Sequence, residues 1–276
     1  MKLEIKKAFK DVVSLKYFVP YMFIFAVITA LGAIFSNTND TNNVGIGNFT
    51  SVLSYISLGY LFIMINNILN NKELNTEESF GTSLLKSTEN GFKGFVAIAL
   101  NTILLVLIVL LLVIVEVFIF SKMGLITNLN ESNLITEYLW LFSFIIIQLA
   151  PVVLFTLKFL PVVYSERFSI KDTFHWIKIC KNFFKKGSVK ETFAIIGLYV
   201  LVLAILFLSI FGATFVLNLI VVLISKYLLQ SHYVALTFMI NVSTVILPFV
   251  FAMLQYTISG VMFTLLANVY KKEISE

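Results

Sequence analysis

The sequence predicts an all-α integral membrane protein with six transmembrane helices, both termini on the cytoplasmic side, and two amphipathic cytoplasmic loop helices. Hydrophobic residues make up 59% of the chain and charged residues only 13%, and the apolar runs are too long for the core of a soluble protein. Two runs, Thr192 to Ser225 and Tyr233 to Tyr270, contain no Lys, Arg, Asp or Glu. The basic residues gather on alternate loops, and this distribution fixes the orientation of a multi-pass protein.

We expect residues 1–276 to form one membrane domain in the cell (plasma) membrane. The predicted spans are 17–35, 49–69, 92–120, 138–164, 192–224 and 237–269. With these bounds, all of the 20 Lys and Arg residues except Lys122, Lys158 and Lys226 are cytoplasmic or lie beside the cytoplasmic surface. With an odd number of spans, the basic residues would no longer gather on the cytoplasmic side.

The first predicted span follows a lysine-rich N-terminal segment. Its apolar run, 17–35, exceeds the ~7–15 residues of a secretory signal core and can cross the ~30 Å hydrocarbon layer. The N-terminus should therefore stay in the cytoplasm. The next loop, SNTNDTNNVGIGN, is polar and almost uncharged, as expected for a non-cytoplasmic loop. The span 49–69 then returns the chain to the cytoplasmic side.

The first cytoplasmic loop, KELNTEESFGTSLLKSTENGFK, contains a helix-start pattern. Asn75 and Glu78 have the spacing of an N-cap residue and its partner, and Ser169 and Asp172 repeat this spacing in the second cytoplasmic loop. Aligning NTEESF with SIKDTF suggests two duplicated hairpins in the same orientation, related by an axis along the membrane normal. Independent origin of similar loops is the alternative.

The spans 92–120 and 138–164 contain the two ionisable residues that we expect inside the bilayer. Glu116 lies near the outer end of its span, where it is either an interfacial carboxylate or a ligand of an intramembrane ion. Lys158 lies between Pro151 and Pro161, which should kink the helix. Its side chain either extends to the inner interface or turns into the bundle, where it would need an acidic or carbonyl partner.

The segment 166–190, ERFSIKDTFHWIKICKNFFKKGSVK, is basic and amphipathic. The pattern predicts a helix beginning near Ile170. Its apolar face carries Trp176, Ile177, Ile179, Cys180, Phe183 and Phe184, and its opposite face carries Lys171, Lys178, Lys181 and Lys185. A helix of this kind can lie flat in the membrane interface, with Trp176 and Phe183 in lipid and the four lysines at phospholipid headgroups. The alternative is a loop helix that packs on its own protein. On the apolar face we expect Cys180 to be a buried, inert thiol rather than a nucleophile.

Two stretches resemble a known family. LGYLFIMINNILNNKELNTEESFGTSLLKSTENGFKGF and FLPVVYSERFSIKDTFHWIKICKNFF are similar to the cytoplasmic loop regions of archaeal and bacterial multi-span membrane proteins known as domain of unknown function 4013. The closest matches are Gly59-Tyr60 and Gly91-Phe92-Lys93-Gly94. The resemblance covers most of the chain and implies an integral membrane protein, with no known activity attached. A fainter likeness is to the membrane domain beside some glycerophosphodiesterases.

The sequence contains no recognisable catalytic, metal or cofactor motif. The single cysteine excludes an internal disulfide and a multi-cysteine metal site, and the two histidines, His175 and His232, are predicted on opposite sides of the membrane. We find no phosphate-binding glycine loop and no nucleophile elbow. We therefore expect no cofactor, no nucleic acid partner and no enzyme activity.

Three functions remain open. The favoured one is a non-enzymatic membrane module whose cytoplasmic loop helices engage membrane lipid, in particular anionic lipid, or a membrane-protein partner or second copy of the chain. The second is a small-solute transporter or channel that uses the bundle interior near Lys158. The third, a lipid-modifying enzyme, is least favoured because no acid, base or metal ligands can be assembled at one interface.

Overall fold

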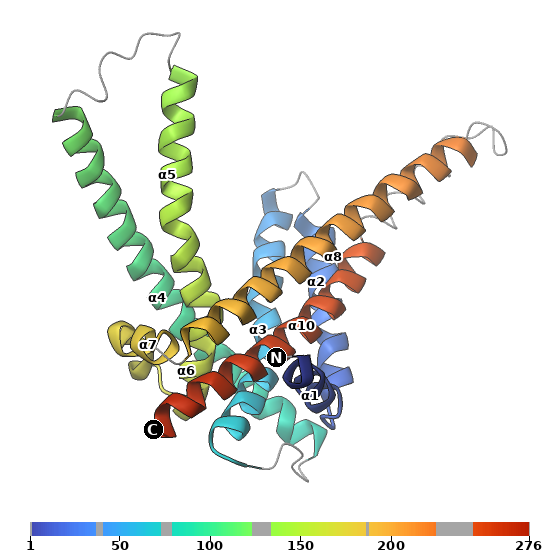
Figure 1. Cartoon of the computed structure of the whole chain (residues 1–276). Coiled ribbons are helices and arrows are strands. Elements are labelled where there is room, and N and C mark those ends of the chain that lie inside the picture. Colours follow the sequence, from blue (N-terminus) through green and yellow to red (C-terminus); the bar gives the residue numbers. More distant parts are fainter. Residues whose placement is uncertain are drawn as a thin grey trace.

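The computed structural model describes residues 2–36, 41–72, 79–122, 134–185, 188–224 and 245–275, and these ranges are helical and contain no β-strand (Figure 1). The elements are α1 (Lys2–Val13), α2 (Phe18–Ser36), α3 (Thr41–Leu69), α4 (Phe80–Lys122), α5 (Leu134–Leu154), the π-helix η1 (Phe155–Phe159), α6 (Leu160–Arg167), the 3-10 helix η2 (Lys171–Phe174), α7 (Trp176–Phe183), α8 (Val189–Ile224) and α10 (Leu247–Ser275). The predicted all-α class is confirmed for this part of the chain.

Four stretches of the described chain are long and apolar enough to cross a membrane. They are Phe80–Ile119, Ile145–Arg167, Val189–Val216 and Leu247–Lys272. A fifth is counted if Glu4–Val13 and Phe18–Ile34, which are bent by 83° at a short break, form one span. The apolar part of α3, Leu53–Leu69, is shorter than these. The protein thus has four to five candidate spans, whereas the sixth span and the side of the termini stay predictions.

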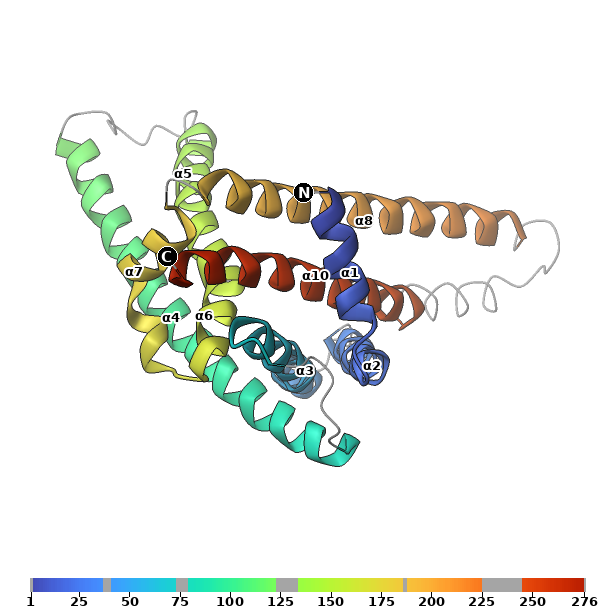
Figure 2. The same cartoon turned by 60° about the horizontal axis from the view of Figure 1, so that its bottom comes forward.

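The centre of the molecule is formed by α2, α3 and α10, and α1 lies across α10 (Figure 1, Figure 2). The rings of Tyr21 on α2 and Tyr60 on α3 stack with centroids 4.3 Å apart. The buried hydroxyl of Tyr256 on α10 donates to the backbone oxygen of Ser57 on α3 at 2.9 Å. Aromatic packing and the hydrogen bond of the Tyr256 hydroxyl hold the three helices together.

Helices α3 and α4 touch at their backbones. A Cβ atom at Gly59 would collide with the backbone oxygen of Ser87, and one at Gly91 would collide with that of Tyr55. Small residues are what permit such close helix contacts in membrane proteins. The two glycines belong to the stretches that carry the family resemblance, and their role here is to let the two helices cross.

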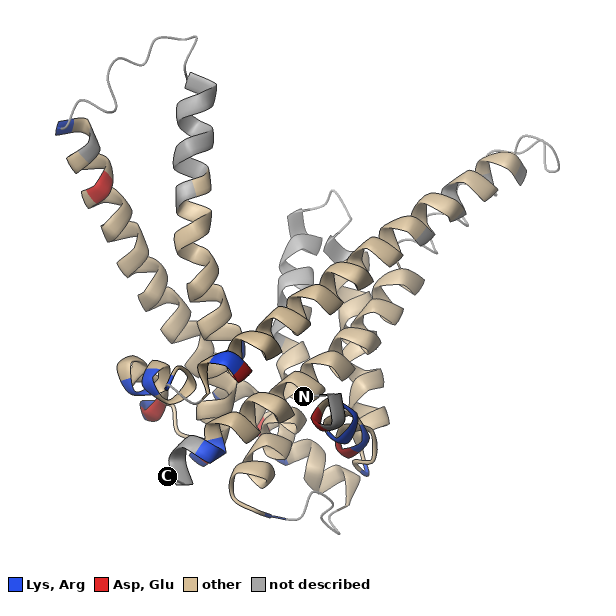
Figure 3. Cartoon of the chain, in the orientation of Figure 1, with Lys and Arg blue, Asp and Glu red and all other residues tan. Residues whose placement is uncertain are grey.

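Two arms leave the centre: α4 and α5 extend together in one direction, and α8 extends in another (Figure 1). Their outer surfaces are apolar, since Phe207 and Phe211 of α8 are each 66% exposed and Ile147 of α5 is 69% exposed. Charged residues instead gather around α1, η2, α7, the start of α8 and the end of α10, whereas Glu116 and Lys122 lie near the outer end of α4 (Figure 3). We call this region the charged end. Exposed apolar helices with charges at one end are typical of membrane proteins.

The prediction of a separate helix in the first cytoplasmic loop is wrong. Helix α4 begins at Phe80 and continues through the predicted span to Lys122, as one helix of 43 residues. Its first turn is capped by Ser79, whose hydroxyl oxygen accepts the N–H of Thr82 at 3.3 Å. The predicted cap residues, Asn75 and Glu78, lie outside the described residues. No proline stands between residues 80 and 122, so nothing ends the helix at the membrane boundary.

The second predicted loop helix is divided into two short pieces. Helix α6 ends at Arg167, and Phe168 has a positive φ of 52° that turns the chain. The turn η2 follows, and α7 begins only after His175, whose φ of −84° and ψ of 56° are not helical. The prediction of one continuous helix from near Ile170 is therefore wrong.

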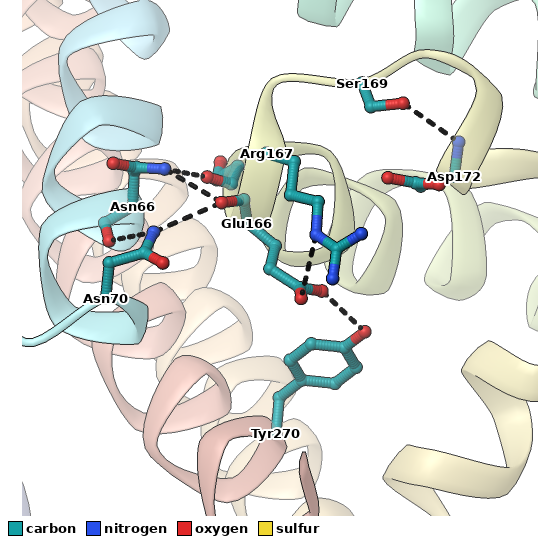
Figure 4. Close-up of polar contacts among 8 residues, drawn as sticks. Asn66, Asn70, Glu166, Arg167, Ser169, Asp172 and Tyr270 are labelled. Atoms are coloured by element: carbon teal, nitrogen blue, oxygen red, sulfur yellow. Dashed lines mark hydrogen bonds and ion pairs between the residues drawn. The ribbon is translucent and has the colours of Figure 1, made fainter.

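The predicted cap of this segment does form, but it caps a shorter element. The hydroxyl oxygen of Ser169 accepts the N–H of Asp172 at 3.4 Å, at the start of η2 (Figure 4). The first loop leads directly into a long helix, whereas the second contains η2 and α7. In the described residues, the sequence that follows the pattern is one long helix in the first loop and two short helices in the second.

Candidate functional site

The inner side of α7 packs on the protein itself. Phe183 is fully buried, and its ring stacks on Phe159 of η1 and Tyr270 of α10, with centroid distances of 4.4 and 5.1 Å. Ile179, one turn earlier, is 2% exposed. Phe183 therefore does not face lipid, contrary to the prediction. The part of the apolar face that carries Ile179 and Phe183 is therefore covered by the bundle, whereas Ile177 of the same predicted face is exposed.

A buried amide fastens η2 and α7 to α4. Asn101 of α4 is fully buried, donates to the hydroxyl of Thr173 at 2.8 Å and accepts from the indole N–H of Trp176 at 2.6 Å. Its amide also donates to the backbone oxygen of Ala97 at 2.8 Å. Trp176 is thus half-buried with its polar atom turned inward, and it does not form an interfacial lipid contact through that atom. Because the buried amide of Asn101 is hydrogen-bonded to both η2 and α7, it holds these two elements in one position.

The outer side of the segment is basic. Lys171, Lys178, Lys181 and Lys185 are all exposed. We call these four lysines, together with Ile177, the basic surface. Ile177 is 88% exposed, which is unusual for a large aliphatic side chain beside lysines. The segment thus packs on its own protein, as the second of the two sequence hypotheses predicts, and it presents all four predicted lysines outward.

Cys180 lies within the basic surface. It is exposed rather than buried, so the prediction of a buried thiol is wrong. The side of the thiol that faces the protein is desolvated, which raises its pKa above the usual value. Cys180 is the only cysteine of the chain, so a chemical label attached to it would report on this surface alone.

Two asparagines of α3 hold the end of α6 (Figure 4). The buried amide of Asn66 donates to the backbone oxygens of Ser165 and Glu166 at 2.8 and 3.0 Å, and Asn70 donates to the latter oxygen at 3.2 Å. The last carbonyls of a helix have no partner within it, so these amides act as its cap. Sequence analysis missed them. The available signal was two asparagines spaced four residues apart in an apolar helix, which places both on one face.

The side chain of Glu166 continues this network. One carboxylate oxygen accepts from the hydroxyl of Tyr270 on α10 at 3.1 Å, and the other lies 3.7 Å from Nε of Arg167 (Figure 4). Lys271, next to Tyr270, donates to the backbone oxygen of Ile68 at 2.6 Å. Helices α3, α6 and α10 are therefore joined by polar contacts at the charged end, which gives α7 a fixed base.

Lys158 turns toward another helix. It lies in η1, and its ammonium donates to the hydroxyl oxygen of Tyr199 on α8 at 2.6 Å. The same nitrogen lies 3.8 Å from the Tyr199 ring centroid and 5.9 Å from that of Phe263 on α10. Of the two orientations that the sequence allows, the ammonium adopts the inward one rather than extending to the inner interface, and its partner is a phenol with aromatic rings rather than a carboxylate or carbonyl. The π-helical geometry of η1 is a local irregularity often found at functional sites.

Glu116 lies far from Lys158 and contacts the neighbouring helix. Its carboxylate accepts from the amide of Gln148 on α5 at 2.7 Å. The contact joins α4 to α5 within their arm (Figure 1). The carboxylate is thus half-buried at a helix interface, so the structure does not bring the two predicted intramembrane residues together.

The described residues include groups that can bind an anionic interface. No group of three or more His, Cys, Asp or Glu side chains in the described part of the chain could hold a metal ion. The basic surface offers four ammonium groups and the exposed side chain of Ile177, a combination that binds anionic interfaces. Comparison of the chain with protein-family models, with curated proteins and with solved structures gives no match.

Proposed function

We propose that this protein is a multi-pass module of the plasma membrane, without catalytic activity, whose basic surface binds anionic phospholipid. One observation carries the proposal. The segment η2–α7 is fixed from behind by Asn101 and Phe183, while all four of its lysines are exposed on the other side. A rigid support keeps the lysines together, so binding does not have to order them.

The orientation follows from the distribution of charge. The charged end carries the lysines of α1, the basic surface and the end of α10 (Figure 3), and positively charged flanks stay in the cytoplasm. With six spans, both termini and the basic surface then lie on the cytoplasmic side. The cytoplasmic leaflet is the anionic one, and each Lys near it contributes about 1 kcal/mol. Ile177 would enter the headgroup layer beside them.

The test uses Cys180 as a reporter in the intact chain. A fluorescent donor on Cys180 is combined with nanodiscs of neutral phosphatidylcholine that contain a small fraction of acceptor-labelled lipid, either anionic phosphatidylglycerol or neutral phosphatidylcholine. Energy transfer to the anionic acceptor should be severalfold stronger, since four lysines act at about 1 kcal/mol each near the surface. The excess should fall at 1 M salt, where the Debye length is only about 3 Å.

Two variants with the same net charge show whether the lipid preference comes from the basic surface or from net charge alone. Changing Lys171, Lys178, Lys181 and Lys185 to Gln should abolish the preference for the anionic acceptor. Changing Lys6, Lys10, Lys93 and Lys122 to Gln alters the net charge equally and should keep it. Equal transfer to both acceptors in the unchanged protein would refute the proposal.

A transporter for a small solute is the second candidate, and the position of Lys158 favours it. An ammonium held inside the bundle by Tyr199, in a π-helical segment, is an arrangement suited to a polar path. Lys158→Met distinguishes the two functions. If this variant keeps its expression and melting temperature and also keeps the lipid preference at Cys180, but loses a cellular function of the protein, transport replaces lipid binding as the first candidate.

A further inference from the structure

A cavity of about 610 Å³ lies at the charged end between α1, α8 and α10. Its volume falls within the ~300–1,000 Å³ typical of ligand-binding pockets. None of the residues of the basic surface lines it. The cavity is therefore a separate site, built from other helices than the surface proposed to bind anionic lipid.

One wall of the cavity is apolar and firmly packed. It is formed by Ala8 of α1, Ile195 of α8, and Leu265 and Val269 of α10, each of which is at most 7% exposed. Helix α1 is itself fixed on α10, because a Cβ atom at Gly260 would come within 3.0 Å of Cγ1 of Val12. The glycine lets α1 lie directly on α10, so the cavity is a stable feature of the fold.

The rim of the cavity carries charges of both signs. Lys7 and Asp11 come from α1 and Lys190 comes from α8. Within the described part of the chain, these three side chains form no ion pair. By contrast, Glu191 and Lys272, which also line the cavity, pair with each other at 3.4 Å across α8 and α10. Glu4 of α1 and Lys271 of α10 also line the cavity, and the ammonium of Lys271 donates to the backbone oxygen of Ile68 and to the side-chain oxygen of Asn71. Lys7, Lys190 and Asp11 therefore present two ammonium groups and one carboxylate to a molecule that enters the cavity.

We propose that this cavity binds the headgroup of an aminophospholipid of the phosphatidylethanolamine type. The phosphate would contact Lys7 and Lys190, the primary ammonium would contact Asp11, and the apolar wall would cover the glycerol and the first acyl carbons. Charge-assisted hydrogen bonds of both signs satisfy such a headgroup. The headgroup carries no net charge, so this site selects by hydrogen bonding, whereas the basic surface selects by charge.

The test measures the affinity of the full chain, purified in detergent and delipidated, for short-chain phospholipids by native mass spectrometry. Lys171, Lys178, Lys181 and Lys185 are changed to Gln throughout, so that phosphatidylglycerol does not bind to the basic surface. Phosphatidylethanolamine should bind more tightly than phosphatidylcholine, whose quaternary ammonium has no N–H donor, and than phosphatidylglycerol, which has no cation. Asp11→Asn should lower the affinity for phosphatidylethanolamine about tenfold, since it removes the charge from one hydrogen bond. Lys7→Gln combined with Lys190→Gln should weaken binding of all three lipids.

Two further variants distinguish an effect on the cavity from an effect on charge or folding. Lys10→Gln changes an exposed lysine of α1 that does not line the cavity, and it should leave all three affinities unchanged. Ala194→Phe fills the cavity from α8 and should abolish binding even if Asp11→Asn lowers the melting temperature. Equal affinity for the three lipids, or unchanged affinity in Asp11→Asn and Ala194→Phe, would overturn the proposal. The four Gln changes on the basic surface should not affect the affinity of the cavity for phosphatidylethanolamine. A result that refutes one of the two proposals therefore leaves the other standing.

Discussion

The ammonium of Lys158 and the hydroxyl of Tyr199 are 2.6 Å apart, and this contact joins η1 to α8. The two residues lie where the arm formed by α4 and α5 meets the start of α8 (Figure 1). A partly buried ammonium is costly unless it has hydrogen-bond partners. The tyrosine supplies an acceptor oxygen and an aromatic face together, which explains how this lysine remains inside the bundle.

Tyr199→Phe should destabilise the protein by about 1–3 kcal/mol, because it leaves the ammonium without its acceptor while keeping the ring. Lys158→Met removes the ammonium itself. If the two residues act through their contact, the double variant should lose less stability than the sum of the single variants, with a coupling of about 0.5–3 kcal/mol. Thermal or denaturant unfolding in detergent measures these changes. Strict additivity would show that the contact contributes nothing.

Asn101→Leu should loosen the η2–α7 segment. The substitution keeps the volume but removes the partners of Thr173 and Trp176, at a cost of about 1–3 kcal/mol. In a Trp140→Phe background, which leaves Trp176 as the only tryptophan, the emission should shift to longer wavelength as the indole becomes more solvated. Thr102→Val is the matched control, because the Thr102 hydroxyl bonds only within α4, to the backbone oxygen of Ile98. Unchanged emission in Asn101→Leu would exclude the anchoring role.

Gly91→Ala should lower the melting temperature sharply, since its Cβ atom would collide with the backbone of α3. Overpacking of this kind costs about 1–3 kcal/mol. Gly81→Ala lies in the same helix, and its Cβ atom would meet nothing within 4 Å. That control should be neutral or stabilising by up to about 1 kcal/mol. Similar melting temperatures for the two variants would mean that α3 and α4 do not cross at these glycines.

The sequence predicts the helical class and the approximate position of several long apolar helices, because long apolar runs have few other solutions. Predicted span 17–35 corresponds to α2, 138–164 lies within α5, η1 and α6, and 192–224 corresponds to α8. The pattern also identified the Ser169 cap, since capping depends on neighbours in the chain. It could not show that α4 continues through the first loop, because the same residues suit a loop helix and a helix extension.

The partners of individual side chains could not be predicted in this way. Helical periodicity placed Phe183 on an apolar face, but the same periodicity is compatible with a face that meets lipid and one that meets protein. The acceptor of Lys158 lies 41 residues away in sequence, and those of Asn66 lie 99 and 100 residues away. Such contacts depend on how the helices pack, and a single sequence contains no local sign of them.

The most direct test of the central claim is the side of the membrane on which Cys180 lies. In intact cells, a membrane-impermeant maleimide should leave Cys180 unlabelled, and permeabilisation should allow labelling, because the thiol is exposed on the protein. A Cys180→Ser chain with Asn42→Cys, in the predicted external loop, should be labelled before permeabilisation. Labelling of Cys180 in intact cells, with no labelling at position 42, would place the basic surface on the outer side and contradict binding to the anionic cytoplasmic leaflet.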